Sequence, residues 1–337
     1  MPLLQITVAA TGAYLFARFV IGHEVPLFAV TVTITSLGFT RDARPSRILQ
    51  TGLGMVTGIA LSELFAMTLG HGIWQLSAIL FICLAIARFI SSSAAFALAV
   101  GTQAMLVFLI APPAGGPFVR SLDGFIGGLT ALVVTALIPR DPRGMARTDA
   151  SKLFTVFLDS LDALKSALRE SDITVADFAL VRVRRTQPLI DNWRLSLDSA
   201  IAVARISPFL RKHQDELAGQ QRILRGMDLA TRNLRVVVRR VDFLLRDGKP
   251  RAYLADLIEQ IQDATELLSK GLSHHEHLED AQQMLLEIIH QLDPKRFGIA
   301  DQLREASVLL LLRPLLIDLL CASGMTEEDA RAELPNI

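Results

Sequence analysis

Charge is nearly absent from the first 140 residues of this 337-residue chain. Residues 1–140 contain seven arginines, no lysine and four acidic residues, whereas residues 141–337 contain 27 basic and 30 acidic residues. The formal net charge of zero hides this division. A long segment that cannot supply a charged surface is predicted to lie in a membrane, with the remainder in water.

The apolar segment divides into six stretches, which can be tested by length. The hydrocarbon core of a bilayer is about 30 Å thick and needs roughly 17 to 25 apolar helical residues. The stretches are residues 3–22, 25–39, 48–69, 73–91, 93–111 and 122–138. The second is the shortest, and its alternation of valine and threonine would favour a strand in water. Because a lone strand in lipid leaves its backbone groups unsatisfied, we predict a short helix that begins at Pro26.

The arginines predict the orientation, since positively charged loops stay on the cytoplasmic side. They follow the even-numbered stretches: Arg41, Arg44 and Arg47 after the second, Arg88 at the end of the fourth, and Arg140, Arg143 and Arg147 after the sixth. Residues 1–7 lack the positive region of a cleaved signal peptide, so the first stretch is expected to remain as a helix. We expect a bacterial cytoplasmic (inner) membrane protein with both termini in the cytoplasm.

The remainder of the chain is predicted to be helical. A cluster of proline, glycine and charge ends the sixth span, and residues 141–147 are interpreted as a linker. Apolar residues at spacings of three and four then predict helices at 148–170, 175–205, 208–246, 250–271, 274–292 and 299–322. The fold class is therefore all-α: six transmembrane helices (1–140) followed by a soluble helical-bundle domain (148–337).

Residues 308–320 are apolar enough to suggest a seventh span. Arg313 and Asp318 would then lie near the bilayer centre, at a cost of about 2.5 to 3.5 kcal/mol each. An odd number of spans would also place the C-terminus outside. We therefore interpret this stretch as a buried helix of the soluble domain.

Small residues recur on the third and sixth stretches. Gly54 and Gly58 follow Thr51 on the third, and Gly124 and Gly128 repeat the spacing on the sixth. Glycines four residues apart allow two helix backbones to approach closely in lipid. We predict tight helix packing at all five positions.

These motifs also resemble a known family. The start of the third stretch, with Arg47, Thr51, Gly54 and Gly58, resembles a motif of the fusaric acid resistance and aromatic acid exporter superfamily. The last span, with Arg120, Gly124 and Gly128, resembles the closing helix of the same superfamily. Gln50 stands where that pattern has a glycine. The resemblance implies six spans followed by a helical cytoplasmic domain, and the export or conduction of small organic anions, namely aromatic carboxylates.

The resemblance also carries expectations about partners. Some members double the six-span unit, so a single unit is expected to form a homodimer in the lipid bilayer. An accessory efflux protein could carry the substrate across a second membrane. The alternative is a membrane-anchored scaffold or sensor that does not transport, whose helical domain binds a partner.

Ionisable groups inside the spans are candidates for the pathway, because they are costly unless they pair or face water. Arg18 and Glu63 lie at similar depth, so they form either a structural ion pair or an anion or proton site. Arg44, Arg47 and Arg88, with Arg41, would surround the cytoplasmic mouth, or would only set the topology. The hydroxyls of Thr31, Thr33 and Thr35 bond between helices or line the pathway.

The soluble domain offers no stronger site. The run of residues 274–277 contains three histidines, but it lacks the spacing of a helical zinc site. The arginines of residues 222–246 could touch anionic lipid or nucleic acid, yet neighbouring acids favour a solvated, ion-paired face. The two cysteines, Cys83 and Cys321, cannot form a disulfide framework. We predict no enzymatic activity, no cofactor, no metal and no nucleic acid.

Overall fold

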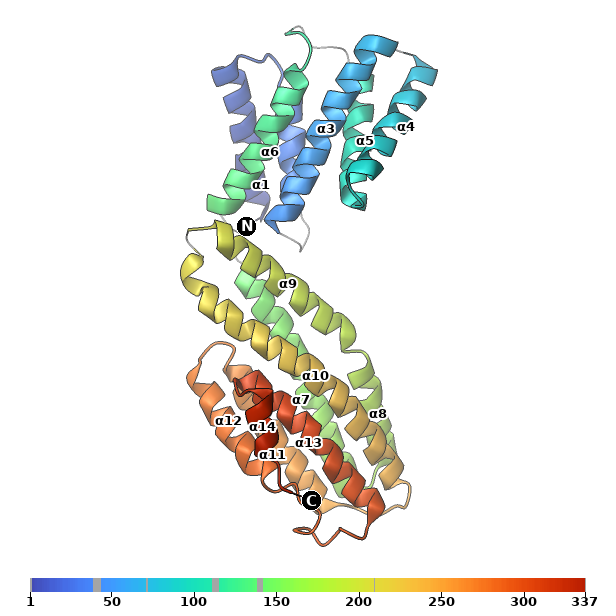
Figure 1. Cartoon of the computed structure of the whole chain (residues 1–337), viewed down its shortest axis with the longest axis vertical. Helices are drawn as coiled ribbons and strands as arrows, with labels where there is room; N and C mark the ends of the chain where they lie inside the picture. The colour runs from blue at the N-terminus through green and yellow to red at the C-terminus, as the bar shows by residue number, and fades with distance from the viewer. Residues whose placement is uncertain are drawn as a thin grey trace. The chain divides into compact units, whose positions relative to one another are not determined.

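A computed structural model describes residues 2–38, 44–70, 72–110, 115–137, 142–208 and 210–336. All the regular elements in these ranges are helices (Figure 1). By its contacts the chain divides into two compact units. The first comprises Met1–Pro142 and Asp198–His213, and the second comprises Arg143–Leu197 and Gln214–Ile337.

The helices of the first unit follow the six apolar stretches. They are α1 (Pro2–Phe16), the π-helix η1 (Ala17–Ile21), α2 (Leu27–Leu37), α3 (Pro45–Leu69), α4 (Ile73–Ile90), α5 (Ala94–Leu109) and α6 (Val119–Leu137). The second stretch is a helix that begins directly after Pro26, rather than a strand. The helices lie alongside one another in Figure 1.

Length separates these helices into two groups. Leu3–Ile21, α3, α4 and α6 are each long and apolar enough to cross a membrane. The helices α2 and α5 are apolar but shorter, with 11 and 16 residues. Their apolar character fits a membrane bundle, whereas the predicted count of six spans remains an expectation.

The centre of the first unit is α3, which packs against α5 and α6, while α2 packs against α6. A Cβ at Gly58 would overlap the backbone of Val100 in α5, and one at Gly54 would lie 3.0 Å from the Phe96 carbonyl oxygen. On the other face of α3, a Cβ at Gly52 would lie 3.6 Å from the Cα of Gly128. Glycine therefore sets the closest approaches of α3 to both neighbours.

The face of α4 that points away from the bundle is apolar. Phe81 and Phe89 on α4 are 73% and 92% exposed. Large apolar side chains exposed to this extent would be unfavourable in water, and lipid is the environment that suits them.

The second unit also consists of helices. They are α7 (Pro142–Glu170), α8 (Ile173–Arg184), α9 (Gln187–Ile206), α10 (Gln214–Leu245), α11 (Ala252–Lys270), α12 (Glu276–Ile289), α13 (Leu303–Ser323) and α14 (Glu327–Ala332). The last residues of α9 and the short 3₁₀ helix η2 (Arg211–His213) belong to the first unit. Trp193 of α9 and Phe154 of α7 are fully buried, and their ring centroids lie 6.3 Å apart.

Three features of the second unit differ from the prediction. Residues 142–147, expected as a linker, are the first turns of α7. The helix expected at 175–205 is two helices, α8 and α9, because Pro188 has no N–H to continue the ladder of hydrogen bonds. The helix α14 was not predicted; Thr326 caps it by accepting a hydrogen bond from the backbone N–H of Asp329 at 3.1 Å.

The apolar helix α13 has the length and composition of a membrane span. It packs against α10, α11, α12 and α14 of its own unit, and α10 lies beside it in Figure 1. Its Asp318 accepts a hydrogen bond from Asn233 of α10 at 2.6 Å, and Arg313 donates one to the Pro335 carbonyl at 2.5 Å. Packing within the second unit therefore accounts for its apolar surface.

Candidate functional site

Polar side chains gather near the start of α6, in a bundle that is otherwise largely apolar. Arg120, Ser121 and Asp123 lie there within four residues; Ser121 contacts Glu63 of α3, and Asp123 contacts His23 of the loop before α2. We call these five residues the polar cluster. It lies at the end of the bundle where α3 and α5 end and α6 begins.

Glu63 is the acidic member contributed by α3. Its side chain is buried, at 7% exposure, and it accepts a hydrogen bond from the Ser121 hydroxyl at 2.7 Å. This bond joins α3 to α6, two helices that also pack directly. A carboxylate removed from water needs such a partner.

Arg120 is the basic member. It is 7% exposed, and its guanidinium donates hydrogen bonds to the carbonyls of Val107 at 2.8 Å and Ile110 at 3.0 Å, at the end of α5. Its Cζ lies 5.6 Å from the centre of the Phe28 ring. Carbonyl dipoles and an aromatic face stabilise the cation without neutralising it. Glu63 interacts with it electrostatically.

Asp123 and His23 form the third contact of the polar cluster. Asp123 is 2% exposed, and its Oδ1 lies 2.6 Å from Nδ1 of His23. The π-helix η1 comes just before His23, and the His23 backbone N–H bonds to the Ala17 carbonyl at 3.1 Å. Single π-helical turns occur frequently at functional sites.

The ion pair between Arg18 and Glu63, one of the two expectations for these residues, is not formed: each has other partners. Arg18 is exposed and donates hydrogen bonds to the Tyr14 hydroxyl and to the Glu24 carbonyl, both at 2.9 Å. Similar depth along two helices does not bring side chains together unless their faces also meet, and Glu63 faces Ser121 of α6 instead.

The arginines expected at the cytoplasmic mouth have separate environments. Arg88 donates to the Ser92 carbonyl at 2.8 Å, just beyond the end of its own helix. Arg44 precedes α3 and forms an ion pair with Asp198 at 2.9 Å, inside the first unit. Arg47 is half-buried in the first turn of α3, and Arg41 lies outside the described residues.

Several of the small and hydroxylated residues lie where helices of the first unit meet. The Thr33 hydroxyl donates a hydrogen bond to the Gly127 carbonyl of α6 at 3.1 Å. A bond between helices was one of the two expectations for Thr33. Thr51 is half-buried beside Gly52, where α3 meets α6. A Cβ at Gly124 would lie 2.7 Å from the Ile59 side chain, and one at Gly128 would lie 3.9 Å from the Cα of Gly52.

Sequence reasoning missed Asp123 and His23, and it counted Arg120 only as part of a family motif. The signal for Asp123 was present, since an acidic residue near the start of an apolar span is costly unless it has a partner. Gln103 of α5 was missed too; it is 2% exposed, and its side-chain oxygen has no hydrogen-bond partner among the described atoms.

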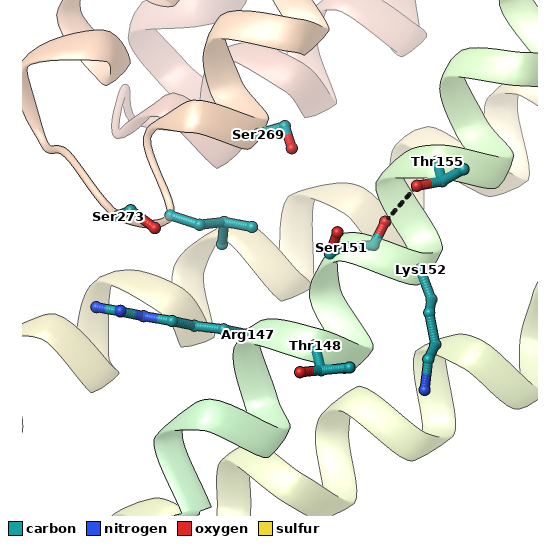
Figure 2. Close-up of a pocket in the computed structure, with 8 residues that line it drawn as sticks. Arg147, Thr148, Ser151, Lys152, Thr155, Ser269 and Ser273 are labelled. Atoms are coloured by element: carbon teal, nitrogen blue, oxygen red, sulfur yellow. Dashed lines mark hydrogen bonds between the residues drawn. The ribbon is translucent and has the colours of Figure 1, made fainter.

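A pocket of about 430 Å³ lies in the second unit, between α7 and the end of α11. It is lined mainly by hydroxyls, with Arg147 and Lys152 pointing in different directions (Figure 2). Arg147 pairs with Glu216 at 2.6 Å, and Lys152 pairs with Asp149 at 3.4 Å. Because carboxylates hold both cations and they do not converge, the pocket is a weaker anion site than the polar cluster.

Charged side chains on α10 of the second unit form ion pairs with their neighbours. Asp228 pairs with Arg194 at 2.9 Å and with Arg232 at 3.0 Å, as expected of an ion-paired face on α10. Among the described residues, no group of three or more His, Cys, Asp or Glu side chains could hold a metal ion.

Apolar helices of spanning length, with one buried polar cluster among them, define an integral membrane protein. Comparison with known proteins gives its relationships. Residues 12–134 match the model of the fusaric acid resistance protein-like family, which confirms the resemblance for this part of the chain.

Two sets of curated relatives extend the comparison. An uncharacterized protein of Corynebacterium glutamicum is 28% identical over 340 residues, which cover 98% of this chain and 87% of the relative. Proteins of Mycobacterium tuberculosis and Mycobacterium bovis named "putative arylamide transporter" are 25% identical over 213 residues, 61% of this chain and 60% of theirs. Together with the apolar helices, these matches support a bacterial membrane transporter.

Proposed function

We propose that this protein transports small organic anions, specifically aromatic carboxylates, by passive or proton-driven flux through the first unit. The observation that supports this is Arg120, a cation at 7% exposure inside an apolar bundle. Its carbonyl and aromatic partners hold the guanidinium without cancelling its charge. That positive charge would attract an anion into the bundle.

The polar cluster suggests how an anion would be recognised. The substrate carboxylate would compete with Glu63 for the positive charge of Arg120, while Glu63 keeps its hydrogen bond from Ser121. The ring of Phe28 beside the guanidinium is 3% exposed and is packed against side chains of α3 and α5. The preference for an aromatic acid therefore rests on the family match rather than on this ring.

The name of the mycobacterial relatives indicates a second substrate class, the neutral aryl amides. The charge of Arg120 separates the two classes, because a neutral amide gains little from a buried cation. Replacing Arg120 should therefore abolish transport of an aromatic acid while leaving that of an aryl amide largely intact.

The wider arrangement is also part of the proposal. Residues 1–140 form six spans in the cytoplasmic membrane, residues 148–337 form a cytoplasmic helical domain, and both termini are cytoplasmic. Two copies associate as a homodimer, and an accessory efflux protein could carry the substrate further. Mass photometry of the purified chain in nanodiscs tests the dimer.

Flux through proteoliposomes tests the function. The purified full chain is expected to move labelled 4-hydroxybenzoate, and the comparison is made with and without an imposed proton gradient. Arg120→Gln should lose this flux, while Arg120→Lys, which keeps the charge, should retain part of it. Exposed Arg18→Gln is the matched control. Absence of flux for both 4-hydroxybenzoate and acetanilide would favour a scaffold or sensor instead.

A further inference from the structure

The two carboxylates of the polar cluster have different electrostatic partners. Glu63 interacts with Arg120, a group that stays charged at any physiological pH. Asp123 interacts with His23, whose charge depends on whether it holds a proton. Histidine is the side chain whose ordinary pKa lies within the physiological range.

One proton therefore decides the net charge of the His23–Asp123 pair. With imidazolium and carboxylate the pair is neutral overall, whereas without the proton it carries one negative charge. Asp123 is 2% exposed, so water does little to screen that charge. Gaining the proton at a His23 ring nitrogen removes an unfavourable buried charge, and losing it restores that charge.

We propose that the His23–Asp123 pair is the site that binds the coupling proton of transport. This inference rests on the proposed function and deepens it, because it places the proton on a pair separate from Glu63. Asp123 follows Arg120 by three residues on α6, so the two side chains leave the same side of this helix. A change of charge at the pair would consequently act close to the Arg120 anion site.

The charged groups around the pair support this assignment. From α1 and η1 come Tyr14 and Arg18, which bond to each other. From α3 comes Glu63, bonded to Ser121, and Arg120 on α6 is directed to the end of α5. The residues of α2 include no titratable side chain. Among the described residues, His23 is thus the group whose charge acts on Asp123.

The experiment separates coupled from uncoupled transport. Full-length protein in proteoliposomes is assayed for accumulation of labelled 4-hydroxybenzoate under a pH gradient, and for exchange of the same probe without one. Asp123→Asn and His23→Gln should keep the exchange and lose the gradient-driven accumulation. Glu24→Gln, an exposed charge change beside His23, should behave as the wild type in both assays.

Each outcome has a definite meaning. Gradient-driven accumulation that survives in both variants would show that the pair is structural. Wild-type flux that does not depend on the gradient would also overturn the inference, although the proposed transport function would stand. Wild type without any flux would contradict the proposed function.

A second readout does not need transport. The difference in unfolding temperature between the wild type and His23→Gln should change with pH if the pair binds a proton. A difference that does not change with pH would contradict proton binding by the pair. This measurement also decides the case if Asp123→Asn fails to fold.

Discussion

The Ser121 hydroxyl donates a hydrogen bond to the Glu63 carboxylate across the α3–α6 interface, at 2.7 Å. The two residues are 58 positions apart in the chain, so only the packing of these helices brings them together. The bond fixes the direction of an acidic side chain that interacts with Arg120. It therefore connects helix packing with the electrostatics of the candidate anion site.

Removing this hydroxyl tests that connection. Ser121→Ala leaves the charge of Glu63 but takes away its donor, so we expect 4-hydroxybenzoate flux to fall about tenfold, since a hydrogen bond to a charged group contributes roughly 1.5 kcal/mol. Ser121→Thr, which restores a hydroxyl, should recover most of the flux. Ser77→Ala on exposed α4 is the control. Equal flux in Ser121→Ala and the control would show that the bond does not position Glu63.

Gly58 provides a prediction about packing. A Cβ at this position would overlap the backbone of Val100, so Gly58→Ala must separate α3 from α5 and should destabilise the protein by about 1 to 3 kcal/mol. The reference is Gly12→Ala on α1, where no atom of a neighbouring helix lies within 4 Å of the new Cβ. Thermal unfolding of both variants in the same detergent checks this, and similar unfolding temperatures would contradict the close approach.

The sequence predicted the elements of the bundle better than the contacts between them. The spans depend on local composition and length, so the start of α2 after Pro26 could be anticipated. The partner of a buried group is not a local property: His23 and Asp123 are 100 positions apart. Arg18 and Glu63 were paired by depth alone, although the rotation of each helix decides which faces meet.

The second unit illustrates the same limit. The spacing of three and four predicted an apolar face on the helix expected at 208–246, and residues of α10 at that spacing, such as Leu234, Val237 and Val241, are buried. The break between α8 and α9 was missed because a proline near the start of a helix and one inside a helix look alike until the preceding turn is known. Thr326 and Asp329 had the spacing of a helix cap, a signal that was present but not used.

An ionic link in the second unit predicts a pH dependence. Arg251 is 4% exposed, and it donates hydrogen bonds to Asp247 at 2.5 Å and to Glu305 of α13 at 3.3 Å. The Arg251 guanidinium holds the pKa of Asp247 well below its usual range. A carboxylate with a depressed pKa stabilises the folded state above the pKa of the unfolded chain, about 4, and this contribution is lost as the pH falls.

The Asp247→Asn variant should therefore be less stable than the wild type at neutral pH, and the difference should shrink as the pH falls from about 5 to 3. Unfolding temperatures of the full chain over this range are the measurement. Exposed Asp301→Asn serves as the control for the loss of one negative charge. A difference that grows toward acid pH would mean that Asp247 is not held as a carboxylate.

The packing of α13 leads to a prediction about topology. If α13 belongs to the helical domain, the turn after α7 and the C-terminus lie on the same side of the membrane, whereas a spanning α13 would place them on opposite sides. Single cysteines at Glu170 and Asn336, both exposed, report on the two positions once Cys83 and Cys321 are replaced by serine. A cysteine at Val25, 73% exposed in the loop before α2, reports on the other side.

Labelling of intact spheroplasts with a membrane-impermeant maleimide then distinguishes the arrangements. We expect Val25→Cys to react from outside, and Glu170→Cys and Asn336→Cys to react only after the membrane is permeabilised. The physical reason is that Arg313 and Asp318 have polar partners within the second unit, which the bilayer centre would not provide. Reaction of Asn336→Cys but not Glu170→Cys in intact spheroplasts would instead place α13 across the membrane.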